Sequence, residues 1–217
     1  MRMRMPLLAG ALCLASSTPA LACNFYSTST FLRIPARPSF GVGVMAQFSD
    51  PMVLSLSGDL AMKLGEKAVV RPAVGLCTYE VLDERENEPF FGADIGINIM
   101  RNQTMSLNLQ SGISYRPSDF GDVMLIPIGA AASFASSSPI SFYAGASLWW
   151  VDIDVAGAES DTDPVLFGGL QGGSGSMAWT LGAQLYMGAD TEFGIVAGLG
   201  MNQGASAIRR IGSVFRK

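Results

Sequence analysis

Apolar and polar residues alternate with a period of two along most of this chain from residue 39 onward. In the clearest run, 91–99, Phe91, Ile95 and Ile97 alternate with Asp94 and Asn98. Such alternation indicates β-strands, because successive side chains of a strand point to opposite faces. Nine clear runs and a weaker tenth follow one another: 39–48, 54–63, 70–77, 91–99, 105–115, 123–135, 140–153, 177–188, 192–202 and 206–215. The pattern predicts an all-β domain over 39–217, after an irregular lead-in at 23–38.

The two faces of these strands differ in composition. One face is strongly apolar, whereas the other is mostly Gly, Ser, Asn, Gln and Ala with few charges. The second face would make a poor water-exposed exterior, but it suits the narrow interior of a barrel whose apolar face meets lipid. The sequence therefore predicts an antiparallel, up-and-down transmembrane β-barrel. We expect ten strands, with eight as the alternative, since bacterial barrels use even numbers.

The polar positions of the interior face form a candidate lumen network. Its members are Asp59, Lys63, Arg71, Asp94, Asn98, Asn108, Gln110 and Gln184. Asp59 and Asp94 are placed to neutralise Lys63 and Arg71, and Asp59 and Arg71 lie on neighbouring expected strands. A three-residue turn at 102–104 would set Asn98 opposite Asn108. Polar groups of this kind stabilise small barrels, so we interpret the network as structural.

Aromatic residues on the apolar face are spaced as two belts. Phe40 and Phe48 share a face and are eight residues apart, as are Phe142 and Trp150. At ~3.3 Å per residue and a tilt of ~40°, eight residues cover about 20 Å, close to the apolar band between the aromatic girdles of a membrane barrel. The candidate girdle residues are Phe40, Phe48, Phe91, Tyr115, Phe142, Trp150, Trp179 and Phe193.

The longer connections between runs all follow odd-numbered runs. They are 81–89, 116–121 and 154–175, and this side of a bacterial barrel faces the cell exterior. The Gly-rich stretch 168–176 is interpreted as part of a flexible outer loop. The acidic group Asp83, Glu84, Glu86 and Glu88 in the first long connection predicts a solvated rim. Divalent-cation binding there is the alternative, because carboxylates suit Ca²⁺ or Mg²⁺, although the spacing is not that of an EF-hand loop.

Composition agrees with a membrane location. Of 217 residues, 49% are apolar and 15% are charged, and the mean hydropathy is +0.32. Outside the N-terminus, however, no stretch reaches the ~18–20 apolar residues of a membrane helix. The net charge is −4, and without a basic patch the chain is not expected to bind nucleic acid.

The first 22 residues are interpreted as an export signal. Arg2 and Arg4 precede an apolar stretch over 6–16, and Ala20 and Ala22 flank a cleavage site of the small-x-small type. Cleavage near Ala22 would make Cys23 the first residue of the mature chain. Lipidation of Cys23, a disulfide with Cys77, which the oxidising periplasm permits, and a free thiol are left as alternatives.

Together, the export signal, the alternation, the aromatic belts and the loop pattern resemble the small outer-membrane β-barrel proteins of Gram-negative bacteria, similar to the OmpA-like and OmpX-like barrels. The resemblance covers roughly 39–215 and rests on pattern, not on a family motif. It implies a location in the bacterial outer membrane, surrounded by lipid and lipopolysaccharide, and assembly by the barrel-assembly machinery. The face formed by Ile211, Ser213 and Phe215 is comparable to the terminal signal of such barrels, although Arg216 and Lys217 follow it.

Histidine is absent from the chain. Catalysis by sites of the Ser-His-Asp type needs an imidazole to move the proton, and the enzymes among outer-membrane barrels generally use one. The cysteines show neither redox nor metal-ligand spacing, and the Gly-rich stretch lacks the lysine of a phosphate loop. We therefore expect no cofactor and a non-enzymatic role in envelope structure, surface interaction or passage of small solutes.

Two other functions stay open at this point. One is a surface binder or adhesin that acts through 81–89 and 154–175. The other is a soluble periplasmic barrel that binds an apolar ligand, as lipocalins do. The oligomeric state is not indicated by the sequence.

Overall fold

The structure is a computed structural model that describes residues 39–48, 52–81, 84–102, 104–118, 121–135, 140–154, 160–174, 177–188 and 191–202. The export signal 1–22, the lead-in 23–38 and the weak tenth run 206–215 lie outside these residues. No helix in the described part of the chain is long and apolar enough to cross a membrane.

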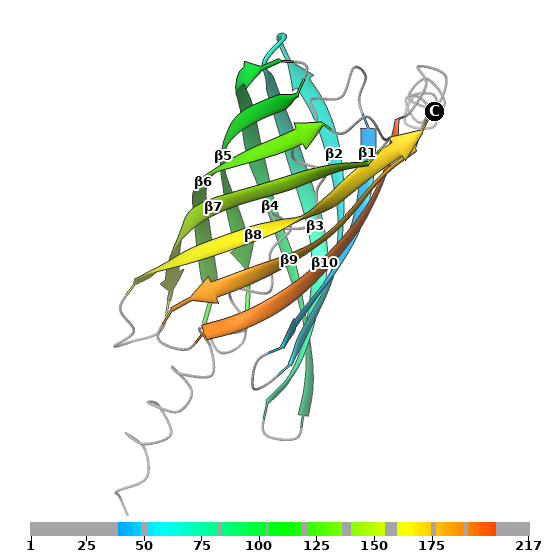
Figure 1. The fold of residues 1–217 in the computed structure, drawn as a ribbon. Helices are drawn as coiled ribbons and strands as arrows, with labels where there is room; N and C mark the ends of the chain where they lie inside the picture. Colours follow the sequence, from blue (N-terminus) through cyan, green and yellow to red (C-terminus); the bar gives the residue numbers. More distant parts are fainter. Residues whose placement is uncertain are drawn as a thin grey trace, which may run out of the picture.

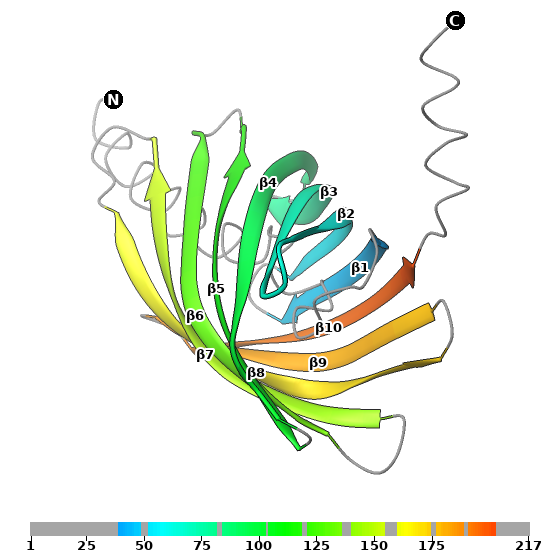
Figure 2. The same ribbon diagram turned by 90° about the horizontal axis from the view of Figure 1, so that it is seen from above.

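Ten antiparallel strands close into one barrel (Figure 1). They are β1 (Ser39–Phe48), β2 (Val53–Leu64), β3 (Ala68–Val81), β4 (Glu84–Arg101), β5 (Met105–Arg116), β6 (Val123–Ala135), β7 (Ile140–Ile153), β8 (Asp161–Ser174), β9 (Met177–Met187) and β10 (Thr191–Asn202). Each strand pairs with the next along the chain, and β10 pairs with β1, so Figure 2 shows the first and last strands side by side. The expected fold, an up-and-down barrel of ten strands, is confirmed, and closure leaves no unpaired sheet edge.

The two ends of the barrel differ in which segments reach them. We call the end where β1 begins and β10 ends, at Ser39 and Asn202, the terminal mouth. We call the opposite end, where Phe48 pairs with Phe193, the far mouth. Because the strands alternate in direction, β3 runs from the terminal mouth to the far mouth and β4 runs back.

Burial alternates along the strands as the sequence predicts. In β2, Val53, Ser55 and Ser57 are buried inside, whereas Leu54 and Leu56 are exposed outside. The same arrangement around the barrel leaves large apolar side chains on the outer surface and buries polar ones within. This distribution is the reverse of a soluble barrel, and it is the one that a lipid-facing exterior requires.

The sequence-based interpretation of 154–175 as one long loop is wrong. Residues 161–174 form β8, which pairs with β7 on one side and β9 on the other. The glycines of this stretch reflect close packing between strands. A Cβ at Gly172 would come within 2.7 Å of the Trp179 ring, and one at Gly168 within 3.1 Å of the Tyr143 carbonyl oxygen. Glycine within a strand often marks such close approach. Here the glycines interrupt the period-two pattern of β8, so the sequence alone did not reveal the strand.

The interpretation of 81–89 as a long loop is also wrong. β3 and β4 remain paired as far as Val81 and Glu84, and their hairpin extends beyond the other strands at the far mouth (Figure 1). The tenth strand is therefore supplied by β8 and not by the weak run 206–215. With β8 in place, the connections 117–122 and 154–160 are the longer ones, and both lie at the far mouth.

Candidate functional site: the barrel lumen

An ion pair lies in the lumen on the side of the terminal mouth. Arg71 of β3 and Asp94 of β4 are directly opposite each other in the register. Nε of Arg71 lies 2.8 Å from Oδ1 of Asp94, and both side chains are buried. Asp59 of β2 is also buried and within electrostatic range of Arg71, as expected from neighbouring strands. Lys63 is exposed at the end of β2, so the expectation that it joins this charge network is wrong.

Glycines on adjacent strands make space for these charged groups. The carboxylate of Asp59 lies against Gly41 of β1, where a Cβ would clash with it. Similarly, Nη2 of Arg71 lies 3.3 Å from where a Cβ of Gly96 would be, and Cβ of Asp94 lies 3.0 Å from that of Gly112. Part of the high glycine content therefore allows lumen side chains to lie flat against the barrel wall.

The amide residues of the candidate network all face the lumen. Asn98 and Asn108 are opposite each other, and Nδ2 of Asn98 donates a 2.8 Å hydrogen bond to Oδ1 of Asn108. The expected pairing across the 102–104 turn is thus confirmed. Gln110 and Gln184 are buried, and Gln184 accepts a hydrogen bond from the hydroxyl of Tyr186.

A layer of buried apolar side chains occupies the lumen on the side of the far mouth, which the sequence interpretation missed. Its members fall into two clusters, Met45, Val53, Ala73, Cys77, Tyr79, Phe90 and Val196 on one part of the wall, and Val123, Leu125, Trp149, Val151, Val165 and Tyr186 on the other. The clusters meet where the hydroxyl of Tyr186 lies 3.5 Å from Sδ of Met45. The rings of Trp149 and Tyr186 pack edge to face at 5.3 Å.

Two sequence doublets could have revealed this layer. Phe90 and Phe91 are adjacent, as are Trp149 and Trp150. Because neighbouring strand residues face opposite sides, one aromatic of each doublet must point into the lumen. Phe90 and Trp149 are the inward members, and both are buried.

A second ion pair lies within the apolar layer, because Glu88 is opposite Cys77 and Arg116 is opposite Val123 in the register. Nε of Arg116 lies 3.2 Å from Oε2 of Glu88, and the Arg116 guanidinium lies 5.6 Å from the centre of the Tyr79 ring. Glu88 is thus a strand residue engaged by arginine, not part of a free acidic loop; Asp83 lies outside the described residues. Among the described residues, no three metal-ligating side chains gather to hold a cation.

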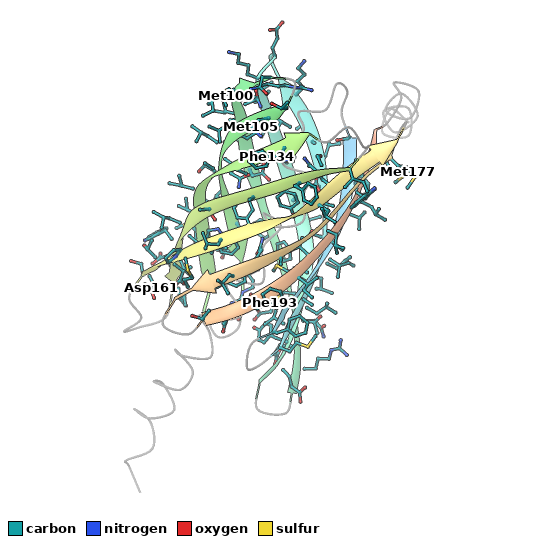
Figure 3. The ribbon with its side chains drawn as sticks, in the orientation of Figure 1. Met100, Met105, Phe134, Asp161, Met177 and Phe193 are labelled. Carbon is teal, nitrogen blue, oxygen red and sulfur yellow. The ribbon has the colours of Figure 1, made fainter. Side chains whose placement is uncertain are left out.

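The candidate girdle residues all point outward, and all except Phe91, which lies midway along β4, are near an end of their strand. Phe48 and Phe193 stack at the far mouth with ring centres 6.4 Å apart, and Phe91 and Tyr115 approach to 5.2 Å; Trp150 belongs to this belt. Phe40, Phe142 and Trp179 lie near the terminal mouth. Phe134, which the sequence interpretation did not include, pairs with Phe142 there. Figure 3 shows Phe134 and Phe193 on the outer surface at opposite ends.

Cys77 belongs to the apolar layer and is disulfide-bonded. Its partner is not among the described residues. Pairing with Cys23 therefore stays a prediction.

Comparison with known proteins supports the fold through structural matches at low sequence identity. No family model matches the sequence, and no curated protein matches it. An outer membrane channel from Pseudomonas putida F1 matches with a TM-score of 0.54 and 8% identity, over 80% of this chain and 98% of that chain. The translocator domain of the autotransporter NalP from Neisseria meningitidis matches with a TM-score of 0.48 and 10% identity, over 91% of this chain and 98% of that chain.

Neisserial surface protein A matches with a TM-score of 0.34 and 15% identity, over 76% of this chain and 96% of that chain. Of these matches, the outer membrane channel has a TM-score above 0.5, and it supports the fold alone. The chain has the fold of the bacterial outer-membrane β-barrels, as the sequence pattern indicates.

Proposed function

We propose that this chain is a non-enzymatic outer-membrane barrel with a closed lumen, whose role lies in the envelope itself and not in free passage of solutes. The observation that carries the proposal is the apolar layer inside the far half of the barrel. Trp149 and Tyr186 are completely buried there, and Phe90 is 1% exposed. An open aqueous channel would leave such lumen side chains in contact with water.

All ten strands contribute to this closure. The two clusters come from β1 to β4 with β10 and from β6 to β9, while β5 supplies Arg116 over the Tyr79 ring. The ion pair Arg71–Asp94 lies on the terminal-mouth side of the layer, and Arg116–Glu88 lies within it. The buried charges of each pair are held by each other, which favours a fixed interior.

Planar-bilayer recordings of the purified protein test the proposal. We expect the native protein to show no steady conductance steps. Trp149→Ala should produce openings because it removes the largest side chain of the layer. Trp150→Ala is the matched control, since it removes the same group from the lipid-facing surface one position along β7. Regular conductance steps from the native protein would instead support solute passage.

The other two functions make different predictions. A surface binder would have to act through the β3–β4 hairpin and the connections at the far mouth, because the two loops first considered are mostly strand. A soluble lipocalin-like barrel would stay monodisperse without detergent, whereas we expect heat-modifiable migration in detergent and resistance to carbonate extraction. The apolar exterior supports the membrane-embedded form. Outer-membrane lipid, lipopolysaccharide and the assembly machinery remain the proposed surroundings and partner.

A further inference from the structure

Cys77 forms its disulfide inside the barrel. It lies on the lumen face of β3 between Ala73 and Tyr79, and its side chain is fully buried. Its neighbour Leu76 points outward and is exposed. The Cβ atoms of a disulfide are only about 3.5–4.5 Å apart, so the segment that carries the partner cysteine must itself enter the lumen.

The sequence limits which cysteine can be the disulfide partner of Cys77. The chain has three cysteines, and the other two, Cys13 and Cys23, both precede β1. Export with cleavage near Ala22 would leave Cys23. We propose that the segment 23–38 enters the lumen through the terminal mouth and is fixed there by a Cys23–Cys77 disulfide, as an internal plug of the barrel. The inference goes beyond the closed-barrel proposal and can fail independently of it.

The length of the segment is sufficient for this path. Cys77 pairs with Ser55, and Ser55 pairs with Met45 of β1. Met45 is six residues after Ser39, the first residue of β1. Cys77 therefore lies about 20 Å along the strands from the terminal mouth. The sixteen residues from Cys23 to Ser39 can span up to about 50 Å when extended. The segment can therefore reach Cys77 with chain to spare for packing in the lumen.

The width of the lumen leaves room for an additional occupant. In barrels of about eight strands, side chains alone fill the interior, and this barrel has ten. Small lumen side chains cannot reach its centre, yet Ala131, which belongs to neither apolar cluster, is 1% exposed. A peptide segment inside the barrel accounts for this burial.

The charges of the segment and the lumen are complementary. The segment 23–38 carries Arg33 and Arg37 and no carboxylate. Buried lumen carboxylates outnumber buried lumen cations among the described residues: Asp59, Glu88, Asp94 and Asp163 against Arg71 and Arg116. Arginines entering this interior would therefore be attracted to it.

Peptide mapping tests the disulfide. The protein is isolated from outer membranes with thiols blocked and is digested with trypsin under non-reducing conditions after unfolding. We expect peptide 23–33 linked to peptide 68–85, and loss of this species on reduction. An unpaired Cys77, a lipid-modified Cys23, or a Cys77 linked to a second chain would overturn the proposal.

Protease access to the folded barrel tests the location of the segment. Trypsin cleavage after Arg33 should be at least tenfold slower in the native oxidised protein than in Cys77→Ser, because the tether holds Arg33 inside the lumen. Equal rates would contradict a lumenal plug. Heat-modifiable migration shows that each variant is folded, and Cys23→Ser replaces Cys77→Ser if the latter fails to fold.

A matched control moves the thiol to the other side of the wall. The double variant Leu76→Cys/Cys77→Ser places the cysteine one position along β3, on the lipid-facing surface. We expect no linked peptide and rapid cleavage after Arg33. A linked 23–33 peptide in this variant would show that the segment reaches β3 from outside and would overturn the lumenal path. Bilayer recordings of the native protein address closure separately, so the two proposals remain distinguishable.

Discussion

Arg71 and Asp94 form a direct cross-strand ion pair inside the barrel, with Nε of Arg71 2.8 Å from Oδ1 of Asp94. Their side chains are 2% and 0% exposed. In such a buried site each charge depends on the other, because an unpaired buried charge is far more costly than a paired one. The pair joins β3 to β4 beside Asp59, and Gly41, Gly96 and Gly112 provide the space that these side chains occupy.

Removing one partner of this pair should destabilise the barrel strongly. Asp94→Ala leaves the Arg71 charge buried without its carboxylate, and we expect a loss of about 3–5 kcal/mol in the free energy of unfolding. Urea unfolding of protein folded into lipid vesicles measures the change. Lys63→Ala, which removes an exposed charge, should change stability by less than about 0.5 kcal/mol. Similar effects for the two variants would contradict the assignment of a buried ion pair.

A charge placed on the apolar surface of the barrel should be costly. Ile97 and Leu109 are directly opposite each other on β4 and β5 and are 41% and 45% exposed. Ile97→Arg or Leu109→Arg should cost about 2–4 kcal/mol in vesicles, since arginine would face the bilayer core. Asn98→Ser, one position along on the lumen face, should be mild. If the lumen change proved the more damaging, the inside and outside faces would be reversed.

Gly41 and Asp59 should show strong energetic coupling. An alanine at Gly41 would place its Cβ on the Asp59 carboxylate, and such overpacking costs about 1–3 kcal/mol. In an Asp59→Ala background the obstruction is gone, so Gly41→Ala should become neutral or slightly stabilising. Unfolding midpoints of the four proteins in this double-mutant cycle give the coupling. Additive effects would mean that the two residues do not touch.

Deletion of 156–172 should prevent the barrel from folding. The deletion removes most of β8, which pairs with both β7 and β9, whereas a true surface loop could be removed with little loss. Heat-modifiable migration after refolding is the measurement. Deletion of 155–159, which lies between β7 and β8, is the control and should leave this migration intact. A folded barrel after the longer deletion would show that β8 is dispensable.

The fold class follows from the sequence because period-two alternation leaves few alternatives. The run 91–99 has an apolar face that water would not tolerate and a second face too small and uncharged to cover it. The register also could be inferred locally: the turn at 102–104 sets Asn98 opposite Asn108, and their hydrogen bond follows. Such pairings depend on neighbours in sequence, so the sequence is sufficient for them.

The strand β8 and the apolar layer required the tertiary structure. Gly168 and Gly172 look like loop residues until the adjacent strands are placed, because the Tyr143 carbonyl leaves little space for a Cβ at Gly168 and the Trp179 ring leaves none at Gly172. Likewise, the sequence places Arg71 near two carboxylates but does not choose between them. The register of β3 against β4 places Asp94 directly opposite Arg71 and so determines the ion pair.

By itself, then, the sequence determined that the chain forms a barrel and which face of most strands meets lipid, because both depend on the alternation within one strand. The tertiary structure decided which segment is the eighth strand, which ions pair and how the lumen is filled. Those features depend on distances between strands far apart along the chain. Tyr186 of β9 meets Met45 of β1 only because the barrel closes.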